Sequence, residues 1–120
     1  MIGAGSLLSA LGVILGAFGA HALKARLEPH DLATFETGVR YHLIHALALV
    51  LVGVLAHKAS VPNLRVVGWA FGAGILVFSG SLYVLVLSGQ RWLGAVTPIG
   101  GLAFIFGWLY LAYLALKTPL

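Results

Sequence analysis

The sequence predicts an all-α fold: an integral membrane four-helix bundle with a short interfacial amphipathic segment between the first and second helices. Residues 66–88 form an apolar run without a charged residue, and three further runs of similar length accompany it. A helix of about 20 apolar residues crosses the hydrocarbon of a bilayer. Of the 120 residues, 61% are hydrophobic and 8% are charged, which leaves too little polar surface to coat a water-soluble globule.

Helices are favoured over a β-barrel, the other structure that satisfies its backbone hydrogen bonds inside lipid. The apolar runs are about twice as long as a barrel strand needs, and they lack strict alternation of polar and apolar residues. We therefore expect residues 1–120 to form a single transmembrane domain.

The first span is predicted over residues 2–23, which carry no charge and end before Lys24 and Arg26. The stretch Ala20-His21-Ala22 also resembles the small-x-small site of a cleaved signal peptide. No lysine or arginine precedes the run, however, and the run is longer than the core of a signal peptide. We expect an uncleaved helix.

Residues 24–38 are predicted to form an interfacial loop, because they contain all three acidic residues of the chain. Pro29 favours an extended backbone at Glu28. Asp31 is the expected N-cap of a helix that leads into the second span. This segment is the main polar surface of the chain, and we expect it to lie at the membrane interface.

The second span is predicted over residues 39–56 and is closed by His57 and Lys58. A turn is expected at Ser60-Val61-Pro62-Asn63, because proline lacks the backbone donor that a continuing helix needs.

The third and fourth spans are predicted over residues 66–88 and 97–116. The polar bridge at residues 88–92 separates them, and its Trp92 suits the headgroup layer. Thr97-Pro98 is a favourable helix start, because threonine caps well and proline is tolerated in the first turn.

Glycine is abundant, with 16 residues in the chain. In membranes, small residues spaced four apart allow helix backbones to approach closely. The glycines expected at helix contacts are Gly12, Gly16, Gly68, Gly72 and Gly107.

Three histidines are the main candidates for function. His42 and His45 lie three residues apart and therefore on one helical face, near the start of the second span. His21 ends the first span, and the loop returns the chain to the same interface, so we expect all three imidazoles at one depth. Titratable groups in a membrane are costly, which makes them functional candidates.

Three interpretations of these histidines stay open: a metal or haem site, an acid/base pair, and hydrogen bonding to helices or lipid phosphate. The chain has no cysteine and no Glu-x-x-His pair. We therefore expect no metal and no cofactor, assign no catalytic residue, and favour the hydrogen-bonding role.

Basic and aromatic residues flank the histidines and suit anionic headgroups, although ordinary anchoring explains them as well. Because the cations are scattered singly at segment ends, a nucleic-acid partner is not expected. The residues predicted to bind lipid or a partner are His21, Lys24, Arg26, Arg40, Tyr41, His42 and His45.

Hydroxyl groups in the third span are expected to form interhelical hydrogen bonds. Ser79, Ser81 and Tyr83 fall near its middle, where such bonds hold helices together. The third and fourth spans contain no acidic residue that could support a serine nucleophile.

Several stretches together resemble the small four-span membrane family of unknown function typified by YgdD and YwdK. They are GAFGAHALK (16–24), HAL (45–47), FSGSLY (78–83), TPIGG (97–101) and GW (107–108). The resemblance covers nearly the whole chain and implies a multi-pass protein of a bacterial-type cytoplasmic (inner) membrane, without an established activity, cofactor or substrate. Among the recurrent polar positions of the family, the resemblance matches His45 most securely, followed by His21. At the position of His42 the family often has a different polar residue, such as glutamine, which favours His21 with His45.

The leading functional hypothesis is a non-enzymatic protein that binds membrane lipids, a second copy of itself or another membrane protein through the His21/His45 side. The alternative is a small membrane-embedded enzyme acting on lipid headgroups or acyl groups, with His45 or His21 as acid/base. A channel has little support, because the sequence predicts no acid or base at mid-membrane. Orientation and oligomeric state stay open, since lysine and arginine divide three against four between the two sides.

Overall fold

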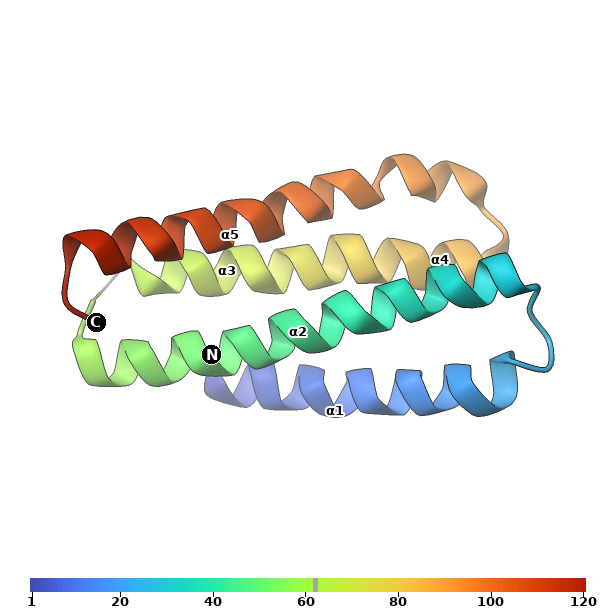
Figure 1. The fold of residues 1–120 in the computed structure, drawn as a ribbon, viewed down its shortest axis with the longest axis horizontal. Coiled ribbons are helices and arrows are strands. Elements are labelled where there is room, and N and C mark those ends of the chain that lie inside the picture. The colour runs from blue at the N-terminus through green and yellow to red at the C-terminus, as the bar shows by residue number, and fades with distance from the viewer. Residues whose placement is uncertain (62) are drawn as a thin grey trace.

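Four long helical segments run side by side along the molecule (Figure 1). The computed structural model describes residues 1–61 and 63–120, and within these ranges every regular element is helical. The four segments cover residues 2–23, 29–59, 64–88 and 91–117, and each is long and apolar enough to cross a membrane. The predicted all-α class with four spanning helices is confirmed.

The first segment consists of α1 (Ile2–Phe18) and a π-helical turn, η1 (Gly19–Leu23). The segment contains no lysine, arginine, aspartate or glutamate, and its one histidine is His21. The segment ends at Lys24, as the sequence predicts.

The second segment is a single helix, α2 (Pro29–Ala59), and it begins earlier than expected. Glu28 has an extended backbone and occupies the N-cap position, and proline fits the first helical turn, where its missing N–H is not needed. The prediction of Asp31 as N-cap is therefore wrong. Asp31 lies in the first turn of α2, where a negative charge interacts favourably with the helix dipole.

The helix α2 ends at Ala59, and Ser60 caps it in the left-handed conformation with φ of 49°. The predicted turn at residues 60–63 includes Pro62, which lies outside the described residues. Beyond it, the backbone N–H of Leu64 donates to the carbonyl of Val61 and starts the next helix.

The third segment is one rod made of α3 (Leu64–Gly74), a π-helical turn, η2 (Ile75–Ser79), and α4 (Gly80–Ser88). Gly89 ends it with φ of 75°, a conformation that glycine adopts without strain. The fourth segment starts with a 3-10 turn, η3 (Arg91–Ala95), and continues as α5 (Thr97–Lys117).

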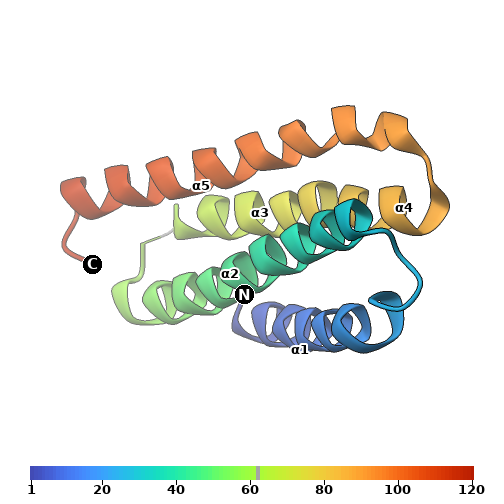
Figure 2. The same ribbon diagram turned by 45° about the vertical axis from the view of Figure 1, so that its right-hand side comes forward.

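The four segments form a flat array. α2 packs between α1 and the α3–α4 rod, and α5 packs on the other side of that rod (Figures 1 and 2). The array measures 49 × 26 × 16 Å along its principal axes. Within an 18-residue apolar stretch of each segment, 17% of the residues are buried in the first segment and 22% in the fourth. The corresponding values are 44% in the second segment and 50% in the third. The two outer helices therefore present most of their surface to lipid.

Two groups of apolar side chains fill the array. The larger lies among α2, α3, η2 and α5 and includes Phe71 and Phe104, while the smaller lies near the α1–α2 loop and includes Phe35 and Leu85. Burial of such side chains among neighbouring helices gives the van der Waals contact that holds membrane helices together.

Several of the predicted glycines allow a side chain of a neighbouring helix to approach closely. A Cβ atom at Gly12 would lie 2.6 Å from Leu43 Cδ2, one at Gly16 3.2 Å from Val39 Cγ1, and one at Gly107 2.6 Å from Phe71 Cε1. Gly68 similarly lies against the Met1 side chain. Gly72 differs from its prediction as a packing residue, because a Cβ there would meet nothing within 4 Å.

Candidate functional site

His42 and His45 lie near the middle of α2, with 1% and 4% of their surfaces exposed. The sequence placed them near the start of a span at residues 39–56. Because α2 begins at Pro29, His45 is 16 residues from its first residue and 14 from its last. The two rings therefore lie at mid-length of the array rather than at its end.

His42 joins three helices through its two ring nitrogens. Nε2 lies 2.8 Å from the carbonyl oxygen of Leu8 on α1, and Nδ1 lies 2.9 Å from the Tyr83 hydroxyl on α4. A carbonyl only accepts, so Nε2 carries a proton and donates to Leu8. The Tyr83 hydroxyl can donate or accept, and burial among apolar helices favours the neutral imidazole, in which Nδ1 accepts from Tyr83.

Two glycines allow this arrangement. Gly12 faces the His42 ring, where a Cβ atom would lie 3.4 Å from His42 Cδ2 and would also collide with Leu43. Gly38 faces Tyr83, where a Cβ would lie 2.9 Å from Cε1. Ser79 adds a bond from the same rod, donating to the Gly38 carbonyl at 2.7 Å. The expected interhelical role of Ser79 and Tyr83 is confirmed.

His45 is held by its own helix and by α5. Nδ1 lies 2.7 Å from the carbonyl oxygen of Tyr41, and the indole N–H of Trp108 donates to Nε2 at 3.0 Å. Because the indole only donates and the carbonyl only accepts, His45 is the neutral Nδ1–H tautomer. Its ring stacks on Phe104 with centroids 3.5 Å apart and an interplanar angle of 11°.

The rings around His45 line a groove between α2 and α5, which we name the α2–α5 groove. Its volume is about 580 Å³. Tyr41 contacts Phe78 in its wall, with ring centroids 4.9 Å apart. The lining residues are Tyr41, Ile44, His45, Phe78, Gly101, Phe104, Ile105 and Trp108.

The α2–α5 groove opens to the surroundings of the array. Ile44 and Ile105 at its edges are 49% and 56% exposed. A second hollow of about 600 Å³ shares Ile44 and Trp108 with it and continues along α2 as far as Val54. The opening is therefore apolar and faces the side that lipid covers.

His21 does not join the other two histidines. It lies exposed in η1, two residues beyond Gly19, which packs against Phe35, whereas Gly12 packs against His42. At a rise of 1.5 Å per residue, this register separates His21 from His42 and His45 by roughly 15–20 Å along the helices. The expected convergence of the three imidazoles is wrong, because α2 starts ten residues before the predicted span and shifts the pairing.

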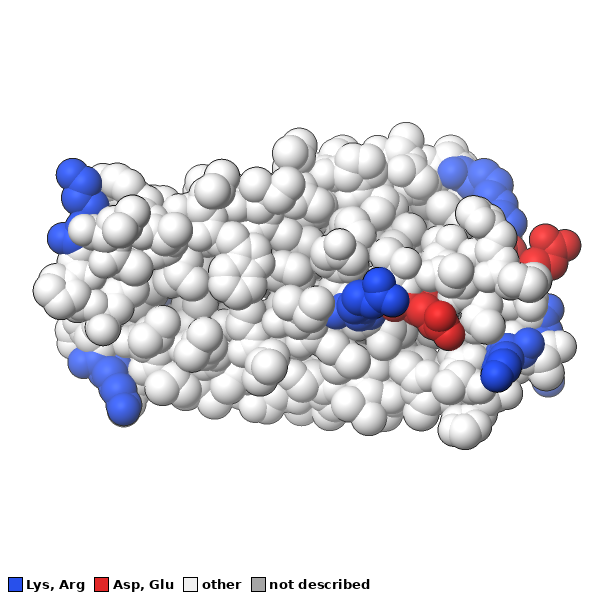
Figure 3. All heavy atoms as spheres, in the orientation of Figure 1, with Lys and Arg blue, Asp and Glu red and all other residues white. Residues whose placement is uncertain are grey.

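The basic residues of the predicted binding set lie toward the end of the array near the α1–α2 loop. Lys24 and Arg26 are exposed next to His21, and Arg40 is exposed on α2 one residue before Tyr41. Figure 3 shows cations and acids together at this end, with one such pair set inward on the face drawn.

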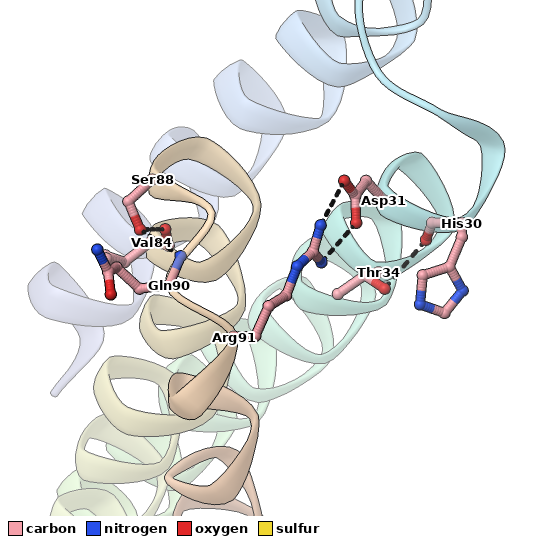
Figure 4. Close-up of polar contacts among 7 residues, drawn as sticks. All are labelled: His30, Asp31, Thr34, Val84, Ser88, Gln90 and Arg91. Carbon is pink, nitrogen blue, oxygen red and sulfur yellow. Dashed lines mark hydrogen bonds and ion pairs between the residues drawn. The ribbon is translucent and has the colours of Figure 1, made fainter.

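Arg91 forms an ion pair that the sequence analysis missed. Its guanidinium, from the start of η3, donates to both carboxylate oxygens of Asp31 on the first turn of α2, at 2.8 and 3.0 Å (Figure 4). These residues lie outside the hydrocarbon, because α2 is about 46 Å long and the hydrocarbon about 30 Å thick. The hydrogen bonds from Arg91 hold the pKa of Asp31 below its usual value.

Within residues 1–61 and 63–120, no three histidine, cysteine or acidic side chains are grouped to hold a metal ion.

The hydrogen-bond partners of the two histidines were not predicted from the sequence. They are Tyr83 for His42 and Trp108 for His45. Trp108 had a signal in the sequence, since an indole N–H in the middle of an apolar span needs an acceptor.

The fold and site define a multi-span α-helical membrane protein with two buried neutral histidines. The family described as "Protein of unknown function (DUF423)" matches residues 15–101. The chain belongs to this family, as its resemblance to YwdK predicts.

Curated relatives agree over almost the whole length. The UPF0382 membrane protein YwdK of Bacillus subtilis is 45% identical over 94% of this chain and 93% of its own length. A UPF0382 membrane protein of Staphylococcus aureus is 43% identical over 94% of this chain and 92% of its own length. A UPF0382 membrane protein of Staphylococcus haemolyticus is 45% identical over 89% of this chain and 87% of its own length. No solved structure matches the chain.

Proposed function

We propose that this protein is a non-catalytic membrane protein that binds the apolar chain of a lipid in the α2–α5 groove. The observation that carries the proposal is the groove itself: about 580 Å³, walled by stacked aromatic rings and open between exposed aliphatic side chains. Small-molecule sites are typically concave, mostly apolar and already formed before the ligand binds.

The hydrogen bonds of His45 keep the groove wall in place. His45 fixes the Trp108 indole through Nε2 and stacks on Phe104, so both large rings of α5 are oriented before a ligand arrives. A wall that is rigid in advance lowers the entropy cost of binding. The position of His45 at mid-length of α2 favours a lipid tail over a headgroup as the bound part.

The headgroup end of the proposed ligand lies toward Arg40 and Tyr41. Arg40 is exposed and long enough to extend its charge toward the interface while its stem stays against apolar surface. Tyr41 lines the groove and is 40% exposed. His21, Lys24 and Arg26 provide a more general contact with anionic headgroups at the end of the array.

The enzymatic alternative receives less support. A general base needs a ring nitrogen within reach of the reacting proton. Both nitrogens of His42 and both of His45 already have hydrogen-bond partners. Within the described residues the structure records no hydrogen bond to His21 that would orient it for catalysis.

The proposal includes the location and the partners. The bacterial relatives, each named a membrane protein, support the cytoplasmic membrane of a bacterium as its location. Lipids are the proposed partners. A second copy of the chain or another membrane protein against the exposed faces of α1 and α5 is the alternative.

The test fills the groove without disturbing the helix contacts. A Cβ atom at Gly101 would lie 3.7 Å from Phe78 Cδ2, an ordinary contact, so Gly101→Leu extends its side chain into the groove. Gly80→Leu is the matched control, because a Cβ at Gly80 meets nothing within 4 Å and Gly80 does not line the groove.

Lipid bound after purification in a non-ionic detergent is measured by native mass spectrometry. We expect the wild-type chain and Gly80→Leu to retain a lipid and Gly101→Leu to lose at least four-fifths of it, roughly a 1 kcal/mol change in binding. Equal lipid in both variants, with equal thermal stability, contradicts the proposal.

A further inference from the structure

We propose a second lipid site, specific for an anionic phospholipid, toward the end of the array away from the α1–α2 loop: Arg65 binds the phosphate, and the groove between α1 and α3 holds an acyl chain. This α1–α3 groove and the α2–α5 groove share no lining residue. The inference is independent of the function proposed above.

The α1–α3 groove has a volume of about 590 Å³. Ala4 and Leu8 of α1 form one wall, Leu49 of α2 forms the floor, and Gly68 and Gly72 of α3 line the other wall. The lining is small or aliphatic along this length, which suits a hydrocarbon chain.

Glycine at position 72 keeps the groove open. A Cβ atom there would meet nothing within 4 Å, so the residue leaves space unfilled instead of bringing two helices together. Trp69 stands at the edge of the groove with 79% of its surface exposed. Tryptophan at such an edge favours the headgroup layer, near the start of an acyl chain.

Arg65 lies at the mouth of the groove. It lines both the α1–α3 groove and an adjoining cavity of about 500 Å³. His57 and Ser60, from the end of α2, also line that cavity. The mouth thus combines a guanidinium with two further hydrogen-bonding side chains, a set that suits the oxygens of a phosphate.

The charge of this end favours an anionic ligand. Lys58, Arg65 and Lys117 lie here, at the end of α2, the start of α3 and the end of α5. All three acidic residues of the chain, Glu28, Asp31 and Glu36, lie toward the other end. Figure 3 shows only blue charged groups at the left end and both colours toward the right.

Arginines at the two ends have different neighbours. Asp31 already engages Arg91 at the loop end through two hydrogen bonds. At the Arg65 end no aspartate or glutamate is placed among the described residues, so a phosphate is the complementary partner that the membrane supplies.

The test titrates the purified full chain in non-ionic detergent with dioleoylphosphatidylglycerol and, separately, with dioleoylphosphatidylcholine. Bound lipid is counted by native mass spectrometry. We expect the wild-type chain to bind phosphatidylglycerol about ten-fold more tightly than phosphatidylcholine, as a few surface cations provide. Arg65→Gln should weaken phosphatidylglycerol binding about five-fold and leave phosphatidylcholine unchanged.

Gly72→Leu fills the tail groove and should weaken binding of both lipids at this site. Gly80→Leu is its matched control, and Lys117→Gln is the control for Arg65→Gln, since Lys117 lies at the same end without lining the groove. Both controls should bind within about two-fold of the wild-type chain. Gly101→Leu should also keep this site, which separates it from the function proposed above.

Three results would overturn the inference. The first is equal affinity of the wild-type chain for the two lipids. The second is an equal loss from Lys117→Gln and Arg65→Gln, which would indicate charge attraction without a site. The third is a dimer that Gly72→Leu dissociates, which would identify a second copy of the chain as the occupant. Thermal unfolding of each variant verifies that it is folded.

Discussion

His42 and His45 lie one turn apart on α2 and are almost equally buried, yet they contact different parts of the molecule. His42 reaches α1 and α4 and joins three helices. His45 bonds to its own helix and to α5, and its ring forms the wall of an open groove. Burial alone therefore does not separate a histidine that connects helices from one that shapes a surface. The partners of its two nitrogens do.

Removal of His42 should have the largest effect on stability. His42→Ala leaves a cavity and deprives both the Tyr83 hydroxyl and the Leu8 carbonyl of a partner, so we expect a loss of about 3 kcal/mol. His42→Gln retains a donor and an acceptor and should lose only about 1 kcal/mol. Reversible unfolding in detergent measures both values. The comparison fails if His42→Ala is less destabilising than His45→Ala.

Removal of His45 should affect stability less and lipid binding more. His45→Ala loses the stack on Phe104 and the bond from Trp108, but the site borders an opening that lipid or detergent can fill. We expect the free energy of unfolding to fall by about 2 kcal/mol and most of the bound lipid to be lost. Unfolding and native mass spectrometry on the same sample test this. Unchanged lipid content would show that the two histidines have the same role.

Removal of a single hydrogen bond from each histidine should sharpen the contrast. Tyr83→Phe removes one donor and keeps its ring, so it should cost about 0.6–1 kcal/mol. Trp108→Phe removes one donor and replaces the indole with a smaller aromatic ring, so it should cost somewhat more, about 1–2 kcal/mol. Tyr83→Phe should leave lipid binding unchanged, whereas Trp108→Phe should reduce it. The same response of lipid binding in both variants would contradict the assignment.

The smallest effect is expected at the exposed ion pair, which gives a baseline for the buried sites. Because Arg91 lowers the pKa of Asp31 in the folded chain, the pair stabilises the fold above the unfolded-state pKa, and this stabilisation is lost as the pH falls through the folded-state pKa. Asp31→Asn should remove that dependence below about pH 4. Unfolding midpoints between pH 3 and 7 measure it. If the unfolding midpoint changes more in Asp31→Asn than in His42→Ala, the ranking of the two sites is reversed.

The spans could be predicted from the sequence because length and hydropathy alone decide which runs cross a bilayer. Residues 2–23 and the third and fourth spans match the helices within a few residues, apart from η3 ahead of α5. The start of α2 could not be predicted, since both Asp31 and Pro29 are acceptable at a helix start and the sequence alone does not decide between them.

The face that carries His42 and His45 could also be predicted, because a spacing of three places residues together on a helix. Their partners could not. Trp108 is 63 residues from His45 and Tyr83 is 41 from His42, so pairing depends on how the helices are shifted and rotated against each other. The same unknown shift explains the misplacement of His21.

The π-helical turn at Ile75–Ser79 has a consequence for insertions and deletions. Such a turn holds one residue more than an α-helical path, so it absorbs that residue without passing a further rotation of about 100° to the rest of the rod. Deleting a single residue within Ile75–Ser79 should therefore restore an α-helical turn and leave Tyr83 facing His42 and Ser81 facing Thr97. The same deletion in the regular helix of Leu64–Gly74 changes the phase by about 100° and should move the side chains before and after it out of register. The wide turn is thus the place in this rod where a change of one residue in length should be tolerated best.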